Sequence, residues 1–309
     1  MKVLFMGTPD LAAVVLEEII RAGHEVAGVV TQPDKAKGRG GKVSFSPVKE
    51  TALKHNLDIY QPVRVRNPEF LRTVRSINPE VIVVAAFGQI LPRELLDIPP
   101  YGCINVHASL LPKYRGAAPI QAAIINGDKE TGVTIMHMDA GIDTGDMILW
   151  ESVPIADDET GGSLHDKLAG LGARLLVEAL KQLKEGTAKR IPQDNSRASY
   201  VKMMDKEMGN IDFSKPAVEI ERLIRGLNPW PSAYTRLDGK ILKIWKAKVV
   251  ENPEGGKPGE VVKVDKNTFT VMTGEGALEI LELQLEGKKR LGCDAFLRGY
   301  PVKKGLVLG

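Results

Sequence analysis

The sequence predicts two domains, an open and mostly parallel α/β sheet followed by a small β-barrel. Apolar strand patterns alternate with helical patterns from residue 1 to residue 186, which is typical of a parallel sheet with helices on both faces. Residues 81–87 form an uninterrupted apolar run of the kind that is buried on both sides. Beyond residue 210, short strand patterns with turn signals replace this alternation and indicate a barrel. A length of 309 residues agrees with two domains.

The elements of the first domain follow from apolar periodicity. Strands are expected at 2–6, 25–31, 58–61, 81–87, 102–107, 132–139 and 147–155. Helices are expected at 10–22, 48–55, 68–77, 119–126 and 164–185. Gly23, Gly127 and Gly186 come directly after three of these helices, at the position where glycine commonly ends a helix.

The second half of the chain shows a different sequence pattern. Residues 187–210 are polar and lack clear periodicity, so we expect a connector there. One helix is expected at 217–226, and five strands at 233–237, 240–250, 259–264, 268–273 and 277–285. Asp238-Gly239 is a good hairpin turn. We therefore expect a first domain at 1–189, a linker at 190–206 and a second domain at 207–309.

Composition restricts the class of protein only broadly. The net charge of +3 and the pI near 8.7 permit an anionic partner without requiring one. Cys103 and Cys293 provide neither a disulfide framework nor metal-ligand spacing, so a reducing cytoplasm is expected. The apolar run at the N-terminus stops at residues 7–10, too early for a signal or membrane segment.

Two loops of the first domain lie where phosphate sites could form. Residues 7–10 occupy the place of a nucleotide fingerprint but lack its glycines, so we expect a helix-start turn and no dinucleotide site. Residues 33–49 form a long basic loop whose three nearby glycines favour mobility. Its lysines and Arg39 suit contacts with phosphates, but a solvated charged loop explains the composition equally well.

A polar cluster at the end of one expected strand is the candidate catalytic site. Asn105 and His107 are two residues apart, so their side chains point to the same face. The carboxyl ends of strands are where open α/β sheets form their ligand crevices. Asp143, in the next polar loop, suits a partner for the imidazole. The competing interpretation is a pair of core polar residues whose hydrogen bonds are satisfied.

The Asn105, His107 and Asp143 set combines an oxyanion donor, a proton shuttle and an orienting carboxylate. No enzyme nucleophile is evident, because Ser109 lacks a nucleophile-elbow context and Cys103 has no base beside it. The set therefore favours direct attack of a substrate nucleophile on a carbonyl-like carbon. In the second domain, Lys240, Lys246 and Lys248 share strand parity. They suit either a nucleic-acid backbone or a solvated barrel face.

The chain resembles the methionyl-tRNA formyltransferase family over essentially its whole length. Asn-Val-His at 105–107 and Ser-Leu-Leu-Pro at 109–112 resemble the catalytic and folate-binding signature of that family. The other matching segments are residues 32–49, 115–119, 139–146, 228–231 and 244–247. The resemblance implies a Rossmann-like formyltransferase domain and an OB-like tRNA-binding domain, which would correspond to the two domains expected above.

The resemblance also implies an activity and roles for single residues. It implies transfer of a formyl group from 10-formyltetrahydrofolate to the α-amine of methionyl initiator tRNA in translation initiation, without a metal, a membrane or an obligate protein partner. Asn105 would donate to the formyl oxygen, His107 would relay a proton, and Asp143 would orient His107. The remaining assignments are folate contacts from Ser109, Leu110, Leu111 and Pro112, a folate border at 139–141, and tRNA contacts from Arg39 and Lys42. The resemblance and the sharp turn at 109–112 together predict a cis Leu111–Pro112 peptide.

Three other functions fit parts of the sequence less well. A folate-dependent formyltransferase that acts on a small amine would need neither the basic loop at 33–49 nor a basic second domain. A non-catalytic tRNA-binding protein would not need the Asn-His-Asp set. A dehydrogenase is disfavoured by the missing glycine fingerprint.

Overall fold

The computed structural model describes residues 1–37, 42–251 and 255–309. The chain forms two compact units. The first comprises Met1–Pro119, Thr131–Val153 and His165–Val201, and the second comprises Ile120–Glu130, Pro154–Leu164 and Lys202–Gly309. The domain boundaries expected from the sequence, with a linker at 190–206, remain a prediction.

The first unit is built on a mostly parallel sheet, as the sequence predicts. Its strand order is β10 (Met147–Pro154), β9 (Glu130–His137), β7 (Cys103–His107), β6 (Val81–Ala85), β1 (Lys2–Gly7), β2 (Glu25–Val30) and β5 (Ile59–Tyr60). The pairs from β7 to β5 are parallel, whereas β9 runs antiparallel to β7. Every residue of β6 is buried, because this apolar strand lies inside the sheet with neighbours on both sides.

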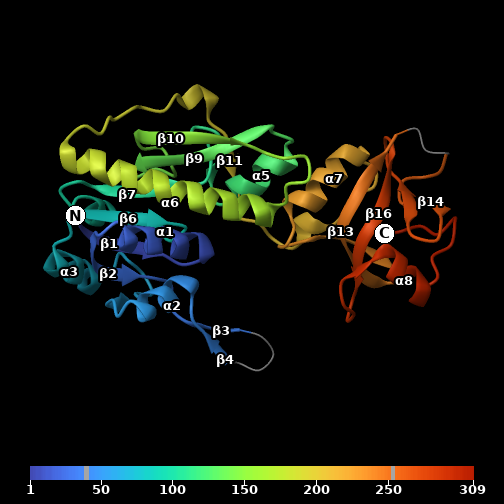
Figure 1. Cartoon of the computed structure of the whole chain (residues 1–309), viewed down its shortest axis with the longest axis horizontal. Helices are drawn as coiled ribbons and strands as arrows, with labels where there is room; N and C mark the ends of the chain where they lie inside the picture. Colours follow the sequence, from blue (N-terminus) through green and yellow to red (C-terminus); the bar gives the residue numbers. More distant parts are fainter. Residues whose placement is uncertain (38–41, 252–254) are drawn as a thin grey trace. The chain divides into compact units, whose positions relative to one another are not determined.

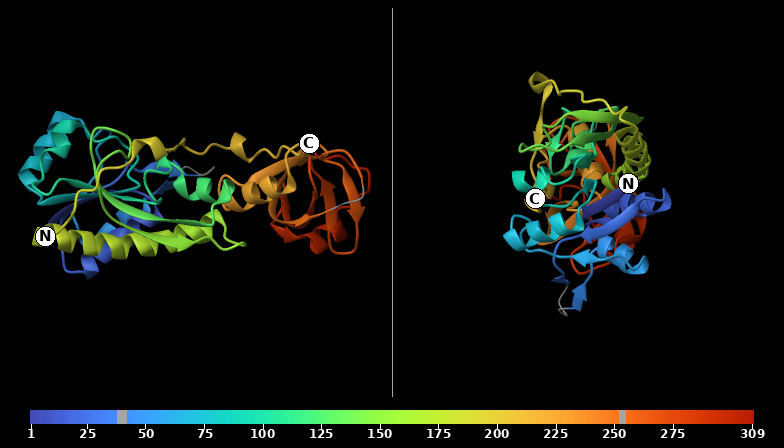
Figure 2. Two further views of the ribbon diagram at one scale, coloured as in Figure 1. Left: turned by 90° about the horizontal axis from the view of Figure 1, so that it is seen from above. Right: turned by 90° about the vertical axis from the view of Figure 1, so that its left-hand side faces the viewer.

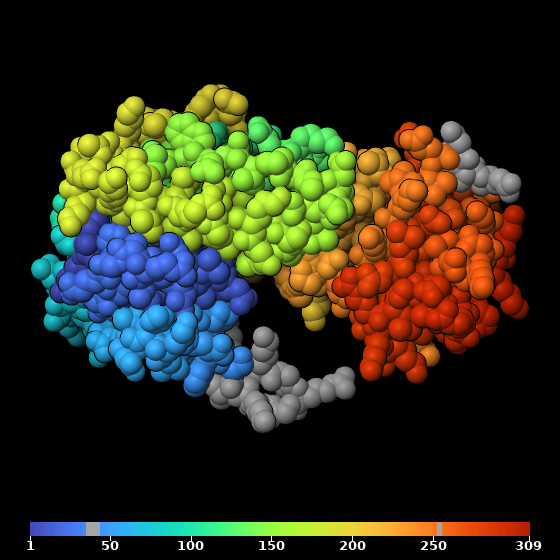
Figure 3. All heavy atoms as spheres, viewed as in Figure 1, coloured from blue at the N-terminus to red at the C-terminus, as the bar shows by residue number. Residues whose placement is uncertain are grey.

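Helices cover both faces of this sheet. Helices α1 (Asp10–Arg21) and α6 (Gly161–Glu185) lie over one face (Figure 1), and α3 (Pro68–Ile77) lies on the other (Figure 2). In the space-filling view, residues of α1 and α6 form much of the surface over their face (Figure 3). The other helices of the first half are α2 (Pro47–Lys54), α4 (Arg93–Leu96) and α5 (Pro119–Ile125). None of the described helices has the length and apolarity needed to cross a membrane.

The turn at residues 7–10 is a helix start, as expected. Pro9 is the N-cap of α1, whose buried residues recur every three or four positions. A Cβ atom added to Gly7 would lie 2.6 Å from the Cβ of Ala12 and 2.9 Å from the carbonyl oxygen of Ala85. Glycine is therefore required here by the close approach of α1 to the sheet, and phosphate binding is not needed to explain it.

The basic segment at 33–49 contains regular structure that the sequence analysis treated as loop. Strands β3 (Lys35–Lys37) and β4 (Lys42–Ser44) pair as an antiparallel hairpin. Ser46 then caps α2, with its Oγ accepting from the backbone nitrogen of Lys49 at 3.1 Å. Arg39 and the side chain of Lys42 lie outside the described part of the chain, so their predicted contacts with tRNA remain predictions.

The second unit contains α7 (Ala217–Gly226) and an antiparallel sheet. The sheet order is β12 (Ala233–Leu237), β13 (Lys240–Val250), β16 (Ala277–Leu285), β15 (Phe269–Met272) and β14 (Val261–Val264), and β17 (Leu291–Gly292) also pairs with β16. The five predicted strands are confirmed. Apolar residues from α7 and from these strands form one core cluster with α8 (Cys293–Gly299). Helix α8 was not predicted from the sequence, because its seven residues span only about two helical turns.

Candidate active site

Strand β7 carries Asn105 and His107 to the carboxyl edge of the sheet. Both side chains are buried, with exposures of 9% for Asn105 and 5% for His107. They share one face because alternate residues of a strand point in the same direction. Parallel pairing of β7 with β6 places the loop after β6 at the same edge. The location expected from the sequence is therefore the one that the structure provides.

The imidazole of His107 is oriented by a backbone carbonyl. Its Nε2 lies 2.9 Å from the carbonyl oxygen of Tyr114. A carbonyl oxygen only accepts, so Nε2 carries the hydrogen and Nδ1 is left to take up a proton. Nδ1 faces Oδ2 of Asp143 at 3.6 Å, which is too long for a hydrogen bond and short enough for an ion pair with a charged imidazole. The orienting group predicted from the sequence is Asp143; the Tyr114 carbonyl was not predicted, because a backbone carbonyl has no residue signature.

The Asp143 carboxylate is held by hydrogen bonds from β7 and from the backbone at residue 116. Its Oδ1 accepts from Nδ2 of Asn105 at 3.2 Å, and its Oδ2 accepts from the backbone nitrogen of Gly116 at 2.8 Å. Its backbone adopts φ 52°, a left-handed conformation that aspartate tolerates better than most residues. The three residues of the predicted set therefore meet at one place, although Asp143 is 38 residues from Asn105 in the sequence.

A fourth side chain, Gln193, supports the loop that carries Asp143. Its Nε2 donates to the carbonyl oxygens of Asp143 at 2.9 Å and Gly145 at 2.8 Å. Earlier in the same loop, Oδ1 of Asp139 accepts from the backbone of Gly141 and from the hydroxyl of Thr144. Gln193 lies in the expected connector and no role for it was predicted, because the preceding chain shows no periodicity that predicts its return to this edge.

The turn after β7 follows the predicted segment at 109–112. The Leu111–Pro112 peptide is cis, which confirms that prediction. Leu111 donates from its backbone nitrogen to Oγ1 of Thr134, which in turn donates to the carbonyl oxygen of Ser109. The hydroxyl of Ser109 donates to the carbonyl oxygen of Lys113 at 2.6 Å. The turn is thus tied to β9, and contacts between these residues and folate remain a prediction.

Neither Ser109 nor Cys103 has the character of a nucleophile. The Ser109 hydroxyl is engaged with a carbonyl and has no base beside it in its described contacts. Burial raises the pKa of the Cys103 thiol to about 12, and nearby Asp97 contributes to the rise. A thiol with so high a pKa is not a thiolate near neutral pH. The site therefore suits reaction between two substrates better than a covalent intermediate on the protein.

The loop after β6 provides an unpaired donor at the same sheet edge. Nε2 of Gln89 is buried without a hydrogen-bond partner in the described structure, while its Oε1 accepts from the backbone of Val65 at 3.0 Å. Buried polar groups are normally paired, so an open donor here suits a polar heterocyclic ligand. No group of three or more potential metal-ligating side chains occurs among residues 1–37, 42–251 and 255–309.

His137 is a buried histidine outside this set. Burial, the Arg190 cation and the opposing Asp146 carboxylate together lower its pKa from 6.5 to about 4, and burial is the largest cause. Between pH 6.5 and pH 4 the unfolded chain therefore binds a proton that the folded chain does not bind. The free energy of unfolding should fall as the pH is lowered through this window, by roughly 2 kcal/mol between pH 7 and pH 5 from this group.

Urea unfolding at pH 7 and pH 5 tests this expectation for wild type and His137→Gln. The glutamine variant should lose less stability between the two pH values. His165→Gln, which changes an imidazole with a 31% exposed side chain, should behave like wild type. An equal loss in wild type and His137→Gln would contradict the assignment.

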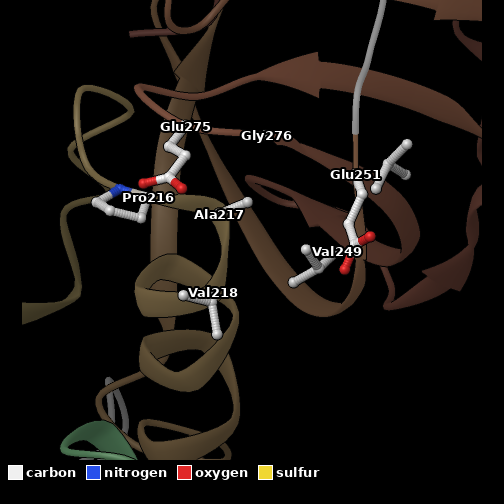
Figure 4. Close-up of a pocket in the computed structure, with 8 residues that line it drawn as sticks. Pro216, Ala217, Val218, Val249, Glu251, Glu275 and Gly276 are labelled. Atoms are coloured by element: carbon white, nitrogen blue, oxygen red, sulfur yellow. The ribbon is translucent and has the colours of Figure 1, made fainter.

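A pocket in the second unit lies between the start of α7 and the end of β13 (Figure 4). Its lining includes two carboxylates, from Glu251 and Glu275, beside the apolar side chains of Val218 and Val249. It contains none of the residues predicted to act in catalysis or binding. The candidate active site is therefore the edge of the first unit's sheet.

Comparisons with known proteins cover both halves of the chain. The formyl transferase family matches residues 1–180, and the formyl transferase C-terminal domain matches residues 203–301. Among solved structures, the sugar 3N-formyl transferase WlaRD has a TM-score of 0.68 at 22% identity, covering 94% of this chain and 99% of that chain. HypX from Aquifex aeolicus in complex with tetrahydrofolic acid has a TM-score of 0.66 at 19% identity, covering 100% of this chain and 50% of that chain. These two likenesses show a shared fold.

Curated relatives are much more similar in sequence. Methionyl-tRNA formyltransferase from Agathobacter rectalis is 57% identical over 305 residues, which are 99% of this chain and 98% of that protein. The protein of the same name from Caldanaerobacter subterraneus subsp. tengcongensis is 55% identical over the full length of both chains. That from Clostridioides difficile is 52% identical, again over the full length of both. The chain therefore belongs to the methionyl-tRNA formyltransferase family.

Proposed function

We propose that this protein transfers a formyl group from 10-formyltetrahydrofolate to the α-amine of methionine on initiator tRNA, in translation initiation. The observation that carries the proposal is the convergence of Asn105, His107 and Asp143 at the sheet edge of a chain that belongs to this family. The charged initiator tRNA is a substrate of cytoplasmic translation, so the proposal places the protein in the cytoplasm.

The reaction is a direct attack of the amine on the formyl carbon. Asn105 uses one hydrogen of its Nδ2 to bind Asp143, and its second hydrogen is available to the formyl oxygen as that oxygen becomes anionic. Nδ1 of His107 takes the proton that the attacking amine loses and returns it to the departing folate nitrogen. Asp143 stabilises His107 while the imidazole carries that proton.

The folate supplies the formyl group, and the residues near the set suit its binding. The turn at 109–112 follows β7 at this edge, and the loop at 139–141 leads into Asp143, whose carboxylate meets Asn105. The buried donor of Gln89 would pair with a polar atom of the pterin ring, which would remove its unsatisfied state. We propose no metal role in this reaction, because the amine and the formyl donor need only a proton shuttle and an oxyanion donor.

Transfer of labelled formyl from 10-formyltetrahydrofolate to charged initiator tRNA tests the function. Charged elongator tRNA and a small amine, such as an amino sugar nucleotide, serve as competing acceptors. We expect labelling of initiator tRNA above both. Faster labelling of the small amine would favour the alternative formyltransferase. Binding of tRNA without any transfer would favour a non-catalytic tRNA-binding protein.

Arg39 and Lys42 are proposed to contact the tRNA. Arg39→Ala should weaken formylation of initiator tRNA and spare folate binding, because a guanidinium makes paired hydrogen bonds to phosphate or to a base edge. Lys42→Ala should have a smaller effect that shrinks as salt rises, since its attraction to phosphate is mainly electrostatic.

Formylation rates and the affinity for a folate analogue, each measured at two salt concentrations, test both variants. Lys54→Ala is a matched control, because Lys54 pairs with Glu17 on the neighbouring helix α1 and has no proposed contact with tRNA. If folate affinity falls as much as tRNA formylation in Arg39→Ala, the segment belongs to the folate pocket and the proposed role is wrong.

A further inference from the structure

Arg115 is a buried cation that has no carboxylate partner among the residues that the structure describes. The residue is 2% exposed and is the largest of the fully buried side chains in the described structure. Its guanidinium donates to Oε1 of Gln193 at 3.1 and 2.8 Å, to Oδ1 of Asn195 at 2.7 Å and to the hydroxyl of Tyr200 at 3.0 Å. A buried charge is costly unless it is well paired. The uncharged hydrogen-bond partners of Arg115 therefore require an explanation other than stability.

The charge of Arg115 determines which way the Gln193 amide faces. A guanidinium has donors and no acceptor, so only the oxygen of the amide can meet it. The amide nitrogen of Gln193 is thereby directed away, toward the carbonyl oxygens of Asp143 and Gly145. A flipped amide would place its NH2 group against the guanidinium donors and its oxygen against the two carbonyl oxygens of the loop.

The backbone around Arg115 serves the same site. The carbonyl of Tyr114 accepts from His107, and the amide of Gly116 donates to the carboxylate of Asp143. Residues 115 and 116 form the short strand β8 (Arg115–Gly116), which pairs with β11 (Tyr200–Val201). Two segments therefore support the His107–Asp143 pair from two sides, residues 114–116 and residues 193–201.

We propose that Gln193, with its amide orientation set by Arg115, is a positioning residue that holds the Asp143 loop against His107 and Asn105. The inference rests on the proposed function, because the loop matters to the reaction only if Asp143 acts there. Gln193 acts through the backbone of Asp143 and has no part in proton transfer. Loss of its two donors should let the Asp143 carboxylate move from its place beside Nδ1 of His107 while the rest of the unit stays folded.

Gln193→Glu is the most informative variant. The glutamate keeps an acceptor for Arg115 and adds a charge that pairs with it, but it has no donor for the two loop carbonyls. We expect kcat for formyl transfer to fall roughly 10- to 100-fold, as expected for a misplacement on the order of 1 Å, with KM values for both substrates within twofold of wild type. The melting temperature should stay near that of wild type.

Asn195→Ala is the matched control. It removes one contact of the same guanidinium and leaves both donors of Gln193 to the loop in place. We expect a lower melting temperature and a kcat within twofold of wild type. An equal loss of kcat in Asn195→Ala and Gln193→Glu would show that the cluster matters only through stability. If Gln193→Glu fails to fold, Gln193→Met, of similar length, replaces it.

A double-mutant cycle with Asp143→Ala decides whether Gln193 acts through Asp143. In the Asp143→Ala background, Gln193→Glu should change kcat by less than twofold, since the carboxylate that it positions is absent. A full additional loss in the double variant would overturn the proposal. Absence of formyl transfer in wild type would instead refute the proposed function, so the two failures are distinguishable.

Discussion

Alanine in place of Asn105 is expected to lower kcat for formyl transfer by about 100- to 1000-fold. The substitution removes the donor proposed to meet the developing oxyanion, and one such donor is worth about 2.7 to 4 kcal/mol of transition-state stabilisation. It also removes the hydrogen bond from Asn105 to Oδ1 of Asp143. The Asp143 carboxylate keeps its hydrogen bond from the Gly116 amide. Single-turnover rates with charged initiator tRNA measure the chemical step directly.

Asn105→Asp is the matched control for this prediction. Aspartate has nearly the same shape, but it offers no donor when ionised and places a second negative charge beside Asp143. We expect its activity to be no higher than that of Asn105→Ala. A folded Asn105→Ala variant with a rate within fivefold of wild type would end the assignment of Asn105 as the oxyanion donor.

Alanine at His107 should lower kcat by about 100- to 10,000-fold, the range typical of a general acid or base. His107→Gln separates this role from packing. Its amide nitrogen can donate to the Tyr114 carbonyl, as Nε2 of His107 does, but the side chain does not take up a proton near neutral pH. The glutamine variant should therefore be closer to wild type in stability than His107→Ala and no more active.

His165→Ala is the matched control for the imidazole. This histidine lies on α6 with Asp166 beside it and has no proposed role in transfer. We expect wild-type kcat from it. Recovery of activity in His107→Gln would mean that His107 only fills space and orients the turn, and the proton relay would have to be assigned to another group.

Most of the fold could be predicted from local sequence patterns. The strands of the parallel sheet are apolar runs whose burial on both faces leaves a clear signal, and the bounds of α3, α7, β12, β13 and β16 match those expected. Elements of two or three residues, such as β8 and β11, were missed, because two residues carry no periodicity. The hairpin of β3 and β4 was missed for the same reason, since each of its strands has only three residues and contains lysine.

The sequence by itself determined the place and the chemical types of the candidate site. Asn105 and His107 share a face because the side chains of a strand alternate, and the end of β7 lies at an edge because the sheet is parallel there. Only the tertiary structure decided how these groups are held. The Tyr114 carbonyl, the Gly116 amide and Gln193 reach the site through chain reversals that bring distant segments together. Backbone groups are the same in every residue, so no sequence pattern distinguishes the few that orient a catalytic side chain from the many that do not.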